Sequence, residues 1–252
     1  MNYVEYGKEN KYDDNIFFQK YSQMSRSQQG LAGAGEWETL RKLLPDFKDK
    51  RVLDLGCGYG WHCIYAMEHG ASSVVGVDIS HKMLEVAKEK THFPQVEYKC
   101  CAIEDVEFPE ESFDVILSSL AFHYVADYEI LVKKIYRILK SGGKLVFTVE
   151  HPVFTAYGTQ DWYYNEKGEI LHFPVDNYYY EGKRTAVFLG EKVTKFHRTL
   201  TTYLNTLLSN GFIINHIVEP QPPEYMMDIP GMRDEMRRPM MLIVSANKKV
   251  DR

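Results

Sequence analysis

Residues 52–80 read VLDLGCGYGWHCIYAMEHGASSVVGVDIS, and this stretch decides the architecture of the chain. It holds an apolar run, a glycine-rich loop, a segment of helix length and a second apolar run that ends on Asp78. Gly56, Gly58 and Gly60 alternate along the loop, so the backbone can approach a ligand where a Cβ would collide. The stretch therefore predicts a strand, a turn, a helix and a second strand arranged around a bound small molecule.

Length and charge narrow the class of protein. A chain of 252 residues suits one large α/β domain with additions. Its 30 Lys and Arg against 35 Asp and Glu give a net charge of −5, which argues against nucleic acid as a partner. Residues 1–14 are polar and acidic, and no run approaches the roughly 20 apolar residues of a membrane span. We therefore expect a soluble, cytoplasmic monomer or homodimer.

The four cysteines do not form a metal-binding pattern. Cys57, Cys63, Cys100 and Cys101 lack both the Cys-x-x-Cys spacing and a zinc-finger arrangement with histidines. Free cysteines are commonly buried as small apolar residues. We therefore expect no metal site.

Alternating strands and helices extend outward from the opening stretch. Residues 1–50 carry two predicted helices, 15–24 and 35–44, and form a segment separate from the domain of residues 51–252. Between residues 51 and 150 we expect strands at 52–55, 73–78, 96–101, 113–119 and 144–150, with helices at 61–69, 81–90 and 129–139. Such alternation predicts a parallel sheet with helices on both faces.

An aromatic-rich insertion follows at residues 152–195. Its alternating residues predict short antiparallel strands, which either cover the mouth of the site or form a purely structural hairpin. A helix at 199–210 and strands at 212–218 and 240–246 complete the chain, with a proline-rich loop between the two strands.

The details of the loop separate two classes of cofactor. Dinucleotide sites usually read G-x-G-x-x-G, whereas the third glycine here comes one residue earlier. Asp54 would repel a pyrophosphate but could bind an ammonium group directly or through water. Asp78, at the end of the second strand, can accept hydrogen bonds from ribose hydroxyls. A cationic ligand such as S-adenosylmethionine therefore fits better than a dinucleotide.

Three further segments carry a family resemblance. They are CAIED at 101–105, FDVILSSLAFH at 113–123 and LKSGGKL at 139–145. With the glycine loop, they make residues 50–150 similar to the class I S-adenosylmethionine-dependent methyltransferases, in particular the methyltransferase type 11 group that includes ubiquinone and menaquinone biosynthesis enzymes. The resemblance implies a Rossmann-like, mostly parallel seven-stranded sheet, with helices on both faces. It also implies that the last strand lies antiparallel between the fifth and sixth.

The resemblance also assigns residues to the cofactor. The glycine loop would lie under the methionine part, and Asp78 would hold the ribose. Ala102 and Ile103 would flank the adenine, and Glu104 would meet its amino group. Residues 1–50 look like a helical lid, in which Arg26 either pairs with the methionine carboxylate or is solvated. The cofactor-binding residues predicted in this way are Tyr21, Arg26, Asp54, Gly56, Cys57, Gly58, Gly60, Asp78, Ile79, Met83, Ala102, Ile103, Glu104, Ser118 and Ser119.

Two histidines are candidates for a general base. His123 follows the fourth strand of the Rossmann-like core and His151 the fifth, where side chains can face the pocket. Either could instead be a packing or hydrogen-bonding histidine. A base is optional, because a sulfonium is an activated methyl donor and transfer chiefly needs an aligned nucleophile and exclusion of water.

The sequence thus predicts a methyltransferase that acts on a small molecule, with the methylated atom left open between O, N and C. The alternatives are an RNA methyltransferase, a non-catalytic module that binds S-adenosylmethionine and, last, an NAD-dependent oxidoreductase. Residues 118–121 read SSLA instead of the Asn/Asp-Pro-Pro-Tyr/Phe motif, so methylation of exocyclic base amino groups or glutamine amides is not suggested.

Overall fold

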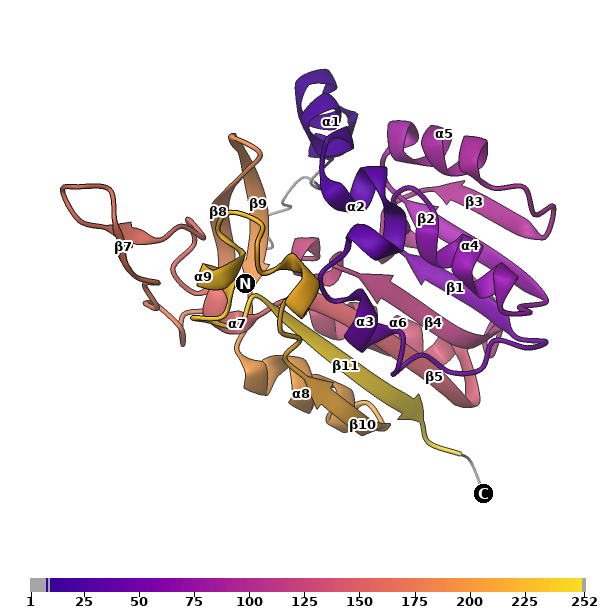
Figure 1. Ribbon diagram of the computed structural model, residues 1–252. Helices are drawn as coiled ribbons and strands as arrows, with labels where there is room; N and C mark the ends of the chain where they lie inside the picture. Colours follow the sequence, from indigo (N-terminus) through magenta and orange to yellow (C-terminus); the bar gives the residue numbers. More distant parts are fainter. Residues whose placement is uncertain (1–7, 9, 251–252) are drawn as a thin grey trace.

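The computed structural model describes residue 8 and residues 10–250 (Figure 1), so residues 1–7 and 9 of the expected lid lie outside the described part. A seven-stranded sheet has the order β10-β11-β5-β4-β1-β2-β3. Its strands are β1 (Arg51–Leu55), β2 (Ser73–Asp78), β3 (Val96–Cys100), β4 (Phe113–Ser119), β5 (Leu139–Glu150), β10 (Phe212–Val218) and β11 (Met241–Lys248).

Helices connect these strands. The α-helices of the sheet domain are α4 (Trp61–Glu68), α5 (His81–Lys90), α6 (Tyr128–Ile138) and α8 (Leu200–Ser209), and the 3-10 turns are η3 (Ile103–Asp105) and η4 (Phe122–Tyr124). The segment before β1 contains η1 (Lys11–Asp13), α1 (Asn15–Ser22), α2 (Ser25–Gln28), η2 (Gly30–Gly33) and α3 (Trp37–Leu40). α3 is shorter than expected, and the chain turns irregularly before Pro45.

Strand direction confirms the expected architecture. β1 pairs in parallel with β2 and β4, as do β2 with β3 and β4 with β5. β11 lies between β5 and β10 and is antiparallel to both. The protein therefore has the Rossmann-like sheet that the resemblance implied.

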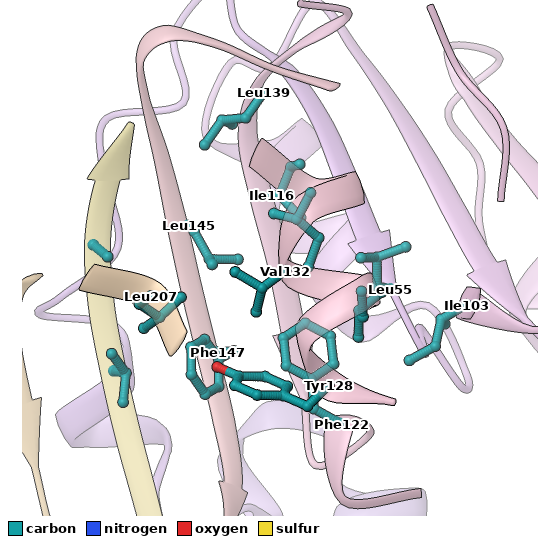
Figure 2. Packing of buried hydrophobic residues seen from close by; sticks show 14 of the residues in the cluster. Leu55, Ile103, Ile116, Phe122, Tyr128, Val132, Leu139, Leu145, Phe147 and Leu207 are labelled. Carbon is teal, nitrogen blue, oxygen red and sulfur yellow. The ribbon is translucent and has the colours of Figure 1, made fainter. Parts of the chain in front are cut away.

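Alternating side chains on the strands make two cores, one on each face of the sheet. Leu55, Ile116 and Phe147 point to the face that α6 and α8 cover (Figure 2), whereas Val52 and Leu117 point to the face that α3 and α4 cover. Successive strand residues face opposite sides, so a strand buried on both faces reads as a continuous apolar run. This burial holds the carboxyl ends of the parallel strands at one edge.

β5 begins earlier than predicted. The sequence suggested a turn at 141–143 and a strand from 144, but the strand runs from Leu139. Its register with β4 shifts between the pairs Phe113–Leu139 and Val115–Lys144, so the extra residues form an irregularity inside the strand. Gly142 lies in this irregular part with a φ of +73°, a backbone conformation that residues with a Cβ rarely adopt.

The insertion forms two small antiparallel pairs beside the main sheet (Figure 1). They follow α7 (Pro152–Thr155) and are β6 (Tyr163–Tyr164) with β7 (Ile170–His172), and β8 (Gly182–Phe188) with β9 (Glu191–His197). β9 continues two residues beyond the expected end of the insertion. Residues 219–240 add η5 (Glu224–Met226) and α9 (Met232–Glu235) between β10 and β11. Within residues 10–250, no helix has the length and apolar character needed to cross a membrane.

Candidate active site

A cavity of about 760 Å³ lies at the carboxyl ends of the parallel strands. Loops after β1 to β5 form its floor, and ligands of open α/β sheets bind at this edge. Three segments provide the rest of the wall: the helical segment before β1, the insertion after β5 and residues 220–241. The cavity is large enough for a cofactor-sized ligand.

The glycine loop between β1 and α4 fits closely against its surroundings. Gly56 has a φ of +79°, and a Cβ at this position would collide with the side chain of Ala121. Gly60 has a φ of +75°, and a Cβ there would collide with the hydroxyl of Tyr98. Gly56 and Gly58 line the cavity, whereas Gly60 lies outside its wall and is the N-cap of α4. Gly56 and Gly58 therefore present backbone to the cavity.

Asp78 closes the loop from the neighbouring strand. Its Oδ2 accepts the Gly58 N–H at 2.9 Å and its Oδ1 accepts the Ser80 N–H at 2.9 Å. Burial raises the pKa of this carboxyl, against the effect of those hydrogen bonds. The carboxylate also lines the cavity, together with Ile79 and Met83. Each carboxylate oxygen can accept more than one hydrogen bond, so Asp78 can hold the loop and a ribose together.

Asp54 lies too deep in the protein to contact a ligand in the cavity directly. Its side chain is buried and does not line the cavity. Oδ2 accepts the Cys63 thiol at 3.4 Å, and Oδ1 has no hydrogen-bond partner among the described residues. Burial raises the Asp54 pKa to about 7. A positive charge above the loop would favour the ionised form, and Asp54 could act on such a charge only through the loop or through water.

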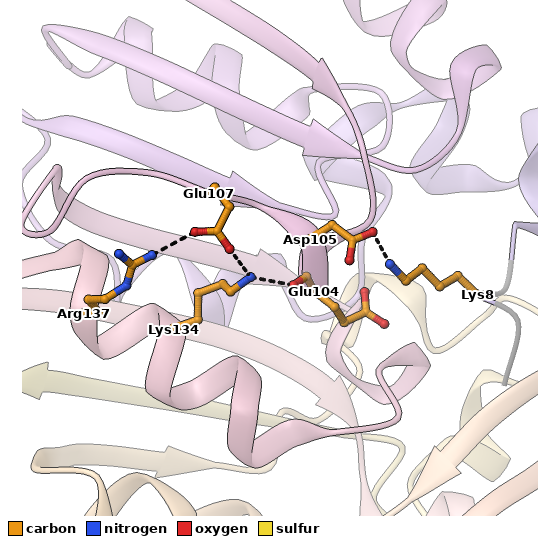
Figure 3. A network of polar contacts seen from close by, with 6 residues as sticks. All are labelled: Lys8, Glu104, Asp105, Glu107, Lys134 and Arg137. Carbon is orange, nitrogen blue, oxygen red and sulfur yellow. Dashed lines mark hydrogen bonds and ion pairs between the residues drawn. The ribbon is translucent and has the colours of Figure 1, made fainter. Parts of the chain in front are cut away.

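The turn after β3 forms the wall where adenine is expected. Ala102, Ile103 and Glu104 line the cavity at the turn after β3. Figure 3 shows how α6 fixes this turn: Lys134 Nζ donates to the Glu104 carbonyl at 2.7 Å and to Glu107 Oε1 at 2.9 Å. Burial raises the pKa of the Glu104 carboxyl, which faces the cavity as an acceptor.

The helical segment before β1 covers this part of the cavity with aromatic rings. Tyr12 and Tyr21 pack edge to face at 5.2 Å, and the Tyr12 hydroxyl lies 3.3 Å from the Tyr124 hydroxyl. Tyr21 and Arg26, both predicted to bind the cofactor, line the cavity. Arg26, however, already pairs with Glu36 at 2.6 and 2.8 Å. A cofactor carboxylate would have to share the guanidinium with Glu36.

A polar cluster lies where β4 and β5 end. Lys195 Nζ on β9 contacts Glu150 Oε1 at 2.5 Å and Gln160 Oε1 at 2.9 Å, and Gln160 Nε2 donates to Glu150 Oε2 at 2.5 Å. His123 Nδ1 accepts the Glu150 backbone N–H at 3.3 Å. Burial lowers the His123 pKa to about 4. Burial raises the Glu150 pKa, but His123, Lys195 and Gln160 together bring it below its ordinary value.

Of the two candidate bases, only His123 faces the cavity. His151 is not part of the cavity wall. Its Nδ1 accepts the Val153 N–H at 3.1 Å at the start of α7, which places the ring proton on Nε2, 2.8 Å from Glu219 Oε1. The expectation that His151 faces the pocket is therefore wrong, because the ring turns back to cap the next helix.

Two other predicted cofactor residues lie outside the cavity wall. Ser118 faces away because its hydroxyl donates to the Leu55 carbonyl at 2.8 Å, so it ties β4 to β1. Cys57 packs into the core of the α4 face. Ser119, the neighbour of Ser118, does line the cavity. Successive residues of a strand point to opposite faces, which explains why only one serine of the pair reaches the cavity.

The sequence reasoning missed the outer wall of the cavity. Residues 220–241 contribute methionines and prolines to it, including Met226, Met232 and Pro230. Arg238 fastens this segment to the insertion, with its guanidinium 4.5 Å from the Phe154 ring centroid and 5.1 Å from that of Trp162. Lys195 was also missed, although its place beside Val193 and His197 on the buried side of β9 is a signal of burial.

These features together fit S-adenosylmethionine better than a dinucleotide. Gly56 and Gly60 leave no room for a Cβ, and Asp54 lies behind the loop with a carboxylate oxygen that has no hydrogen-bond partner among the described residues. Carboxylates attract the positive sulfonium and ammonium groups and repel a pyrophosphate. Asp78 supplies the acceptor that a ribose requires.

Comparisons with known proteins agree with this geometry. Residues 53–147 match the family described as a methyltransferase domain. A crystal structure from Listeria monocytogenes superposes with a TM-score of 0.84 and 57% identity, covering 87% of this chain and 99% of that chain. A structure from Mesorhizobium loti superposes with a TM-score of 0.80 and 41% identity, covering 86% and 100%. A ubiquinone biosynthesis O-methyltransferase from Coxiella burnetii is 36% identical over 112 residues, which span 44% of this chain and 47% of the relative.

Both solved structures carry the assignment of S-adenosylmethionine-dependent methyltransferase, and this chain covers nearly the whole of each. The protein therefore belongs to the S-adenosylmethionine-dependent methyltransferases and uses S-adenosylmethionine as its cofactor.

Proposed function

We propose that the protein transfers the methyl group of S-adenosylmethionine to a small-molecule acceptor bound in the same cavity. The observation that supports this most is the cover: the helical segment before β1, the insertion and residues 220–241 all line the cavity. A covered site favours a small acceptor over a nucleic acid. The net charge of −5 also argues against a nucleic acid as the acceptor.

The acceptor would lie near the ends of β4 and β5, beyond the cofactor residues. Leu120 has a left-handed φ of +54° there, and its N–H donates to the Thr148 carbonyl at 2.9 Å and to Thr148 Oγ1 at 3.0 Å. Such strained backbone persists only where the surroundings fix it, and it is common at functional sites. The turn after β4 is thereby held in one position beside the cavity.

His123 then serves better as a hydrogen-bond donor than as a base. Because its Nδ1 accepts the Glu150 N–H, the proton of the neutral ring lies on Nε2. S-adenosylmethionine supplies an activated methyl group, so the protein's contribution is to align the acceptor and exclude water. We therefore propose that His123 positions the acceptor and that neither His123 nor His151 acts as a general base.

The Coxiella burnetii relative supports a small acceptor by its name, although it matches only about half of each chain. An RNA acceptor is the alternative. Labelled S-adenosylmethionine, incubated with the protein and a cell extract, separates the two. We expect label in the low-molecular-weight fraction; label confined to RNA or protein would contradict the proposal.

A variant pair controls this experiment for the cofactor site. Asp78→Asn should abolish most of the transfer at limiting cofactor, because the ribose acceptor is altered. Asp46→Asn is the matched control, since Asp46 Oδ1 accepts an N–H two residues along, as Asp78 does, but lies exposed and outside the cavity wall. It should transfer label like the wild type.

A further inference from the structure

We propose that Glu150, Lys195 and His123 form the polar end of the acceptor site and that the acceptor is an apolar molecule recognised through an uncharged hydroxyl group. This inference rests on the proposed function and adds the chemical class of the acceptor. All three side chains line the cavity and each is buried. They come from three elements, β5, β9 and the turn η4 after β4, which meet only in the folded chain.

The pairing of Glu150 with Lys195 is unusual for a purely structural contact. The Lys195 side chain is 3% exposed and that of Glu150 is 12% exposed. Removing two charges from water costs free energy that a buried pair often fails to recover, and apolar residues of similar volume are frequently as stable. Gln160, which completes the contacts, also has a left-handed φ of +61°. Such a costly arrangement beside a ligand cavity indicates a role in binding.

The cluster offers a hydroxyl both kinds of hydrogen-bond partner. A carboxylate such as that of Glu150 only accepts, whereas an ammonium such as that of Lys195 only donates. His123 adds a second donor through Nε2–H, because its Nδ1 is occupied by the Glu150 N–H. A hydroxyl group can donate to Glu150 and accept from Lys195 or His123 at the same time.

The charges of the cavity disfavour an anionic acceptor. Lys195 is already neutralised by Glu150 at 2.5 Å, so the cluster carries no net positive charge. Asp78 and Glu104 place two more carboxylates on the wall of the same cavity. An acceptor carboxylate or phosphate would have to displace Glu150 from Lys195, which would leave a carboxylate buried without a cation.

The wall around the cluster indicates the rest of the acceptor. Lys195 Nζ lies 5.4 Å from the centroid of the Phe188 ring, which also lines the cavity. Trp162, Ile170, Met232 and Met240 contribute further apolar surface. Methionine side chains adapt to irregular apolar shapes. The acceptor therefore presents an apolar body to this wall and its hydroxyl to the cluster.

Three probes of one shape test this assignment on the full chain saturated with S-adenosylhomocysteine: 2-naphthol, 2-methylnaphthalene and 2-naphthoate. We expect 2-naphthol to bind about tenfold more tightly than either of the others, as paired hydrogen bonds in a buried site allow. In Glu150→Met/Lys195→Met the advantage of 2-naphthol over 2-methylnaphthalene should fall to about threefold or less, because only His123 remains to bind the hydroxyl. Glu150→Gln/Lys195→Met replaces this variant if it does not fold.

A second pair provides the matched control. Glu129 and Lys133 form an exposed ion pair at 2.7 Å on α6, and Glu129→Met/Lys133→Met should retain the full preference. Equal or tighter binding of 2-naphthoate, no binding of 2-naphthol, or a full preference that survives in the cluster variant used would overturn the assignment. Affinity for S-adenosylhomocysteine is measured in parallel and should not change. Label found only in RNA or protein would instead refute the small-molecule function.

Discussion

Replacing Lys195 by methionine removes the cation beside Glu150 but keeps most of the buried volume. The Glu150 carboxylate then lies in a site where its side chain is 12% exposed, with Gln160 as its remaining side-chain hydrogen-bond partner. A carboxyl group in such surroundings takes up a proton instead of staying charged, because burial favours the neutral form. The variant's loss in free energy of unfolding from this cause is therefore at most the cost of protonating Glu150.

This limit can be calculated from the pH. The ordinary pKa of a glutamate is 4.5, and each pH unit above it adds about 1.36 kcal/mol to the cost of protonation. The cost is about 3.4 kcal/mol at pH 7 and about 0.7 kcal/mol at pH 5. Glu150→Gln/Lys195→Met holds a neutral amide at the same place and avoids this cost. The single variant should thus be less stable than the double variant by about 3 kcal/mol at pH 7.

The sign of the pH dependence follows from proton binding. In the single variant the folded pKa of Glu150 lies above its unfolded value, so the folded state binds more protons and loses stability as the pH rises. Urea unfolding of both variants at pH 5, 6 and 7, followed by the fluorescence of the three tryptophans, measures the difference.

The exposed pair on α6 supplies the control. Lys133→Met and Glu129→Gln/Lys133→Met should differ by about 0.5 kcal/mol or less at every pH, because surface ion pairs contribute little. A difference of less than about 1 kcal/mol between the Lys195 variants at pH 7 would refute the reasoning. So would a difference that does not shrink by pH 5, because Glu150 would then not be responding to a lost cation.

Three further measurements test the site. Asp78→Asn should weaken S-adenosylhomocysteine affinity by about ten- to a hundredfold in calorimetry, whereas Asp46→Asn should not. In urea unfolding between pH 6.5 and about 4, the wild type should lose about 3 kcal/mol more free energy of unfolding than His123→Asn does, because the lowered His123 pKa makes the folded state bind fewer protons; equal losses in the two proteins would contradict this. Gly56→Ala should lower the free energy of unfolding by about 2–4 kcal/mol, because the new Cβ would collide with Ala121. Gly168→Ala should lower it by about 1 kcal/mol, because no atom lies within 4 Å of a Cβ at that position. Equal losses in the two variants would disprove the collision.

The glycine loop and its strands could be predicted because their signals are local. Leu53 and Leu55 face one core while Val52 faces the other, which gives the continuous apolar run of a doubly covered strand. The loop between β1 and α4 is equally local, because Gly56 and Gly60 need left-handed backbone whatever the rest of the chain does.

The acceptor side could not be predicted in the same way. Glu150 and Lys195 are separated by 45 positions and meet only because β9 returns over the end of β5. His151 was misassigned because strand position alone does not say whether the next residue continues into the pocket or begins a helix. In this chain Pro152 starts α7 directly, and His151 becomes its N-terminal cap.

The direction of β11 explains why the missed segment lies over the cavity. β11 is antiparallel to β5, and its first residue, Met241, pairs with Glu150, the last residue of β5. The residues before Met241 must therefore lie at the carboxyl edge of the parallel strands, where the cofactor loops also lie. β10 pairs with β11 from Phe212–Lys248 to Val218–Ile243, so the connection after Val218 begins at the same edge. A proline-rich loop that looked like a simple link in the sequence is thereby placed over the cavity, which explains why its methionines and prolines form part of the cavity wall.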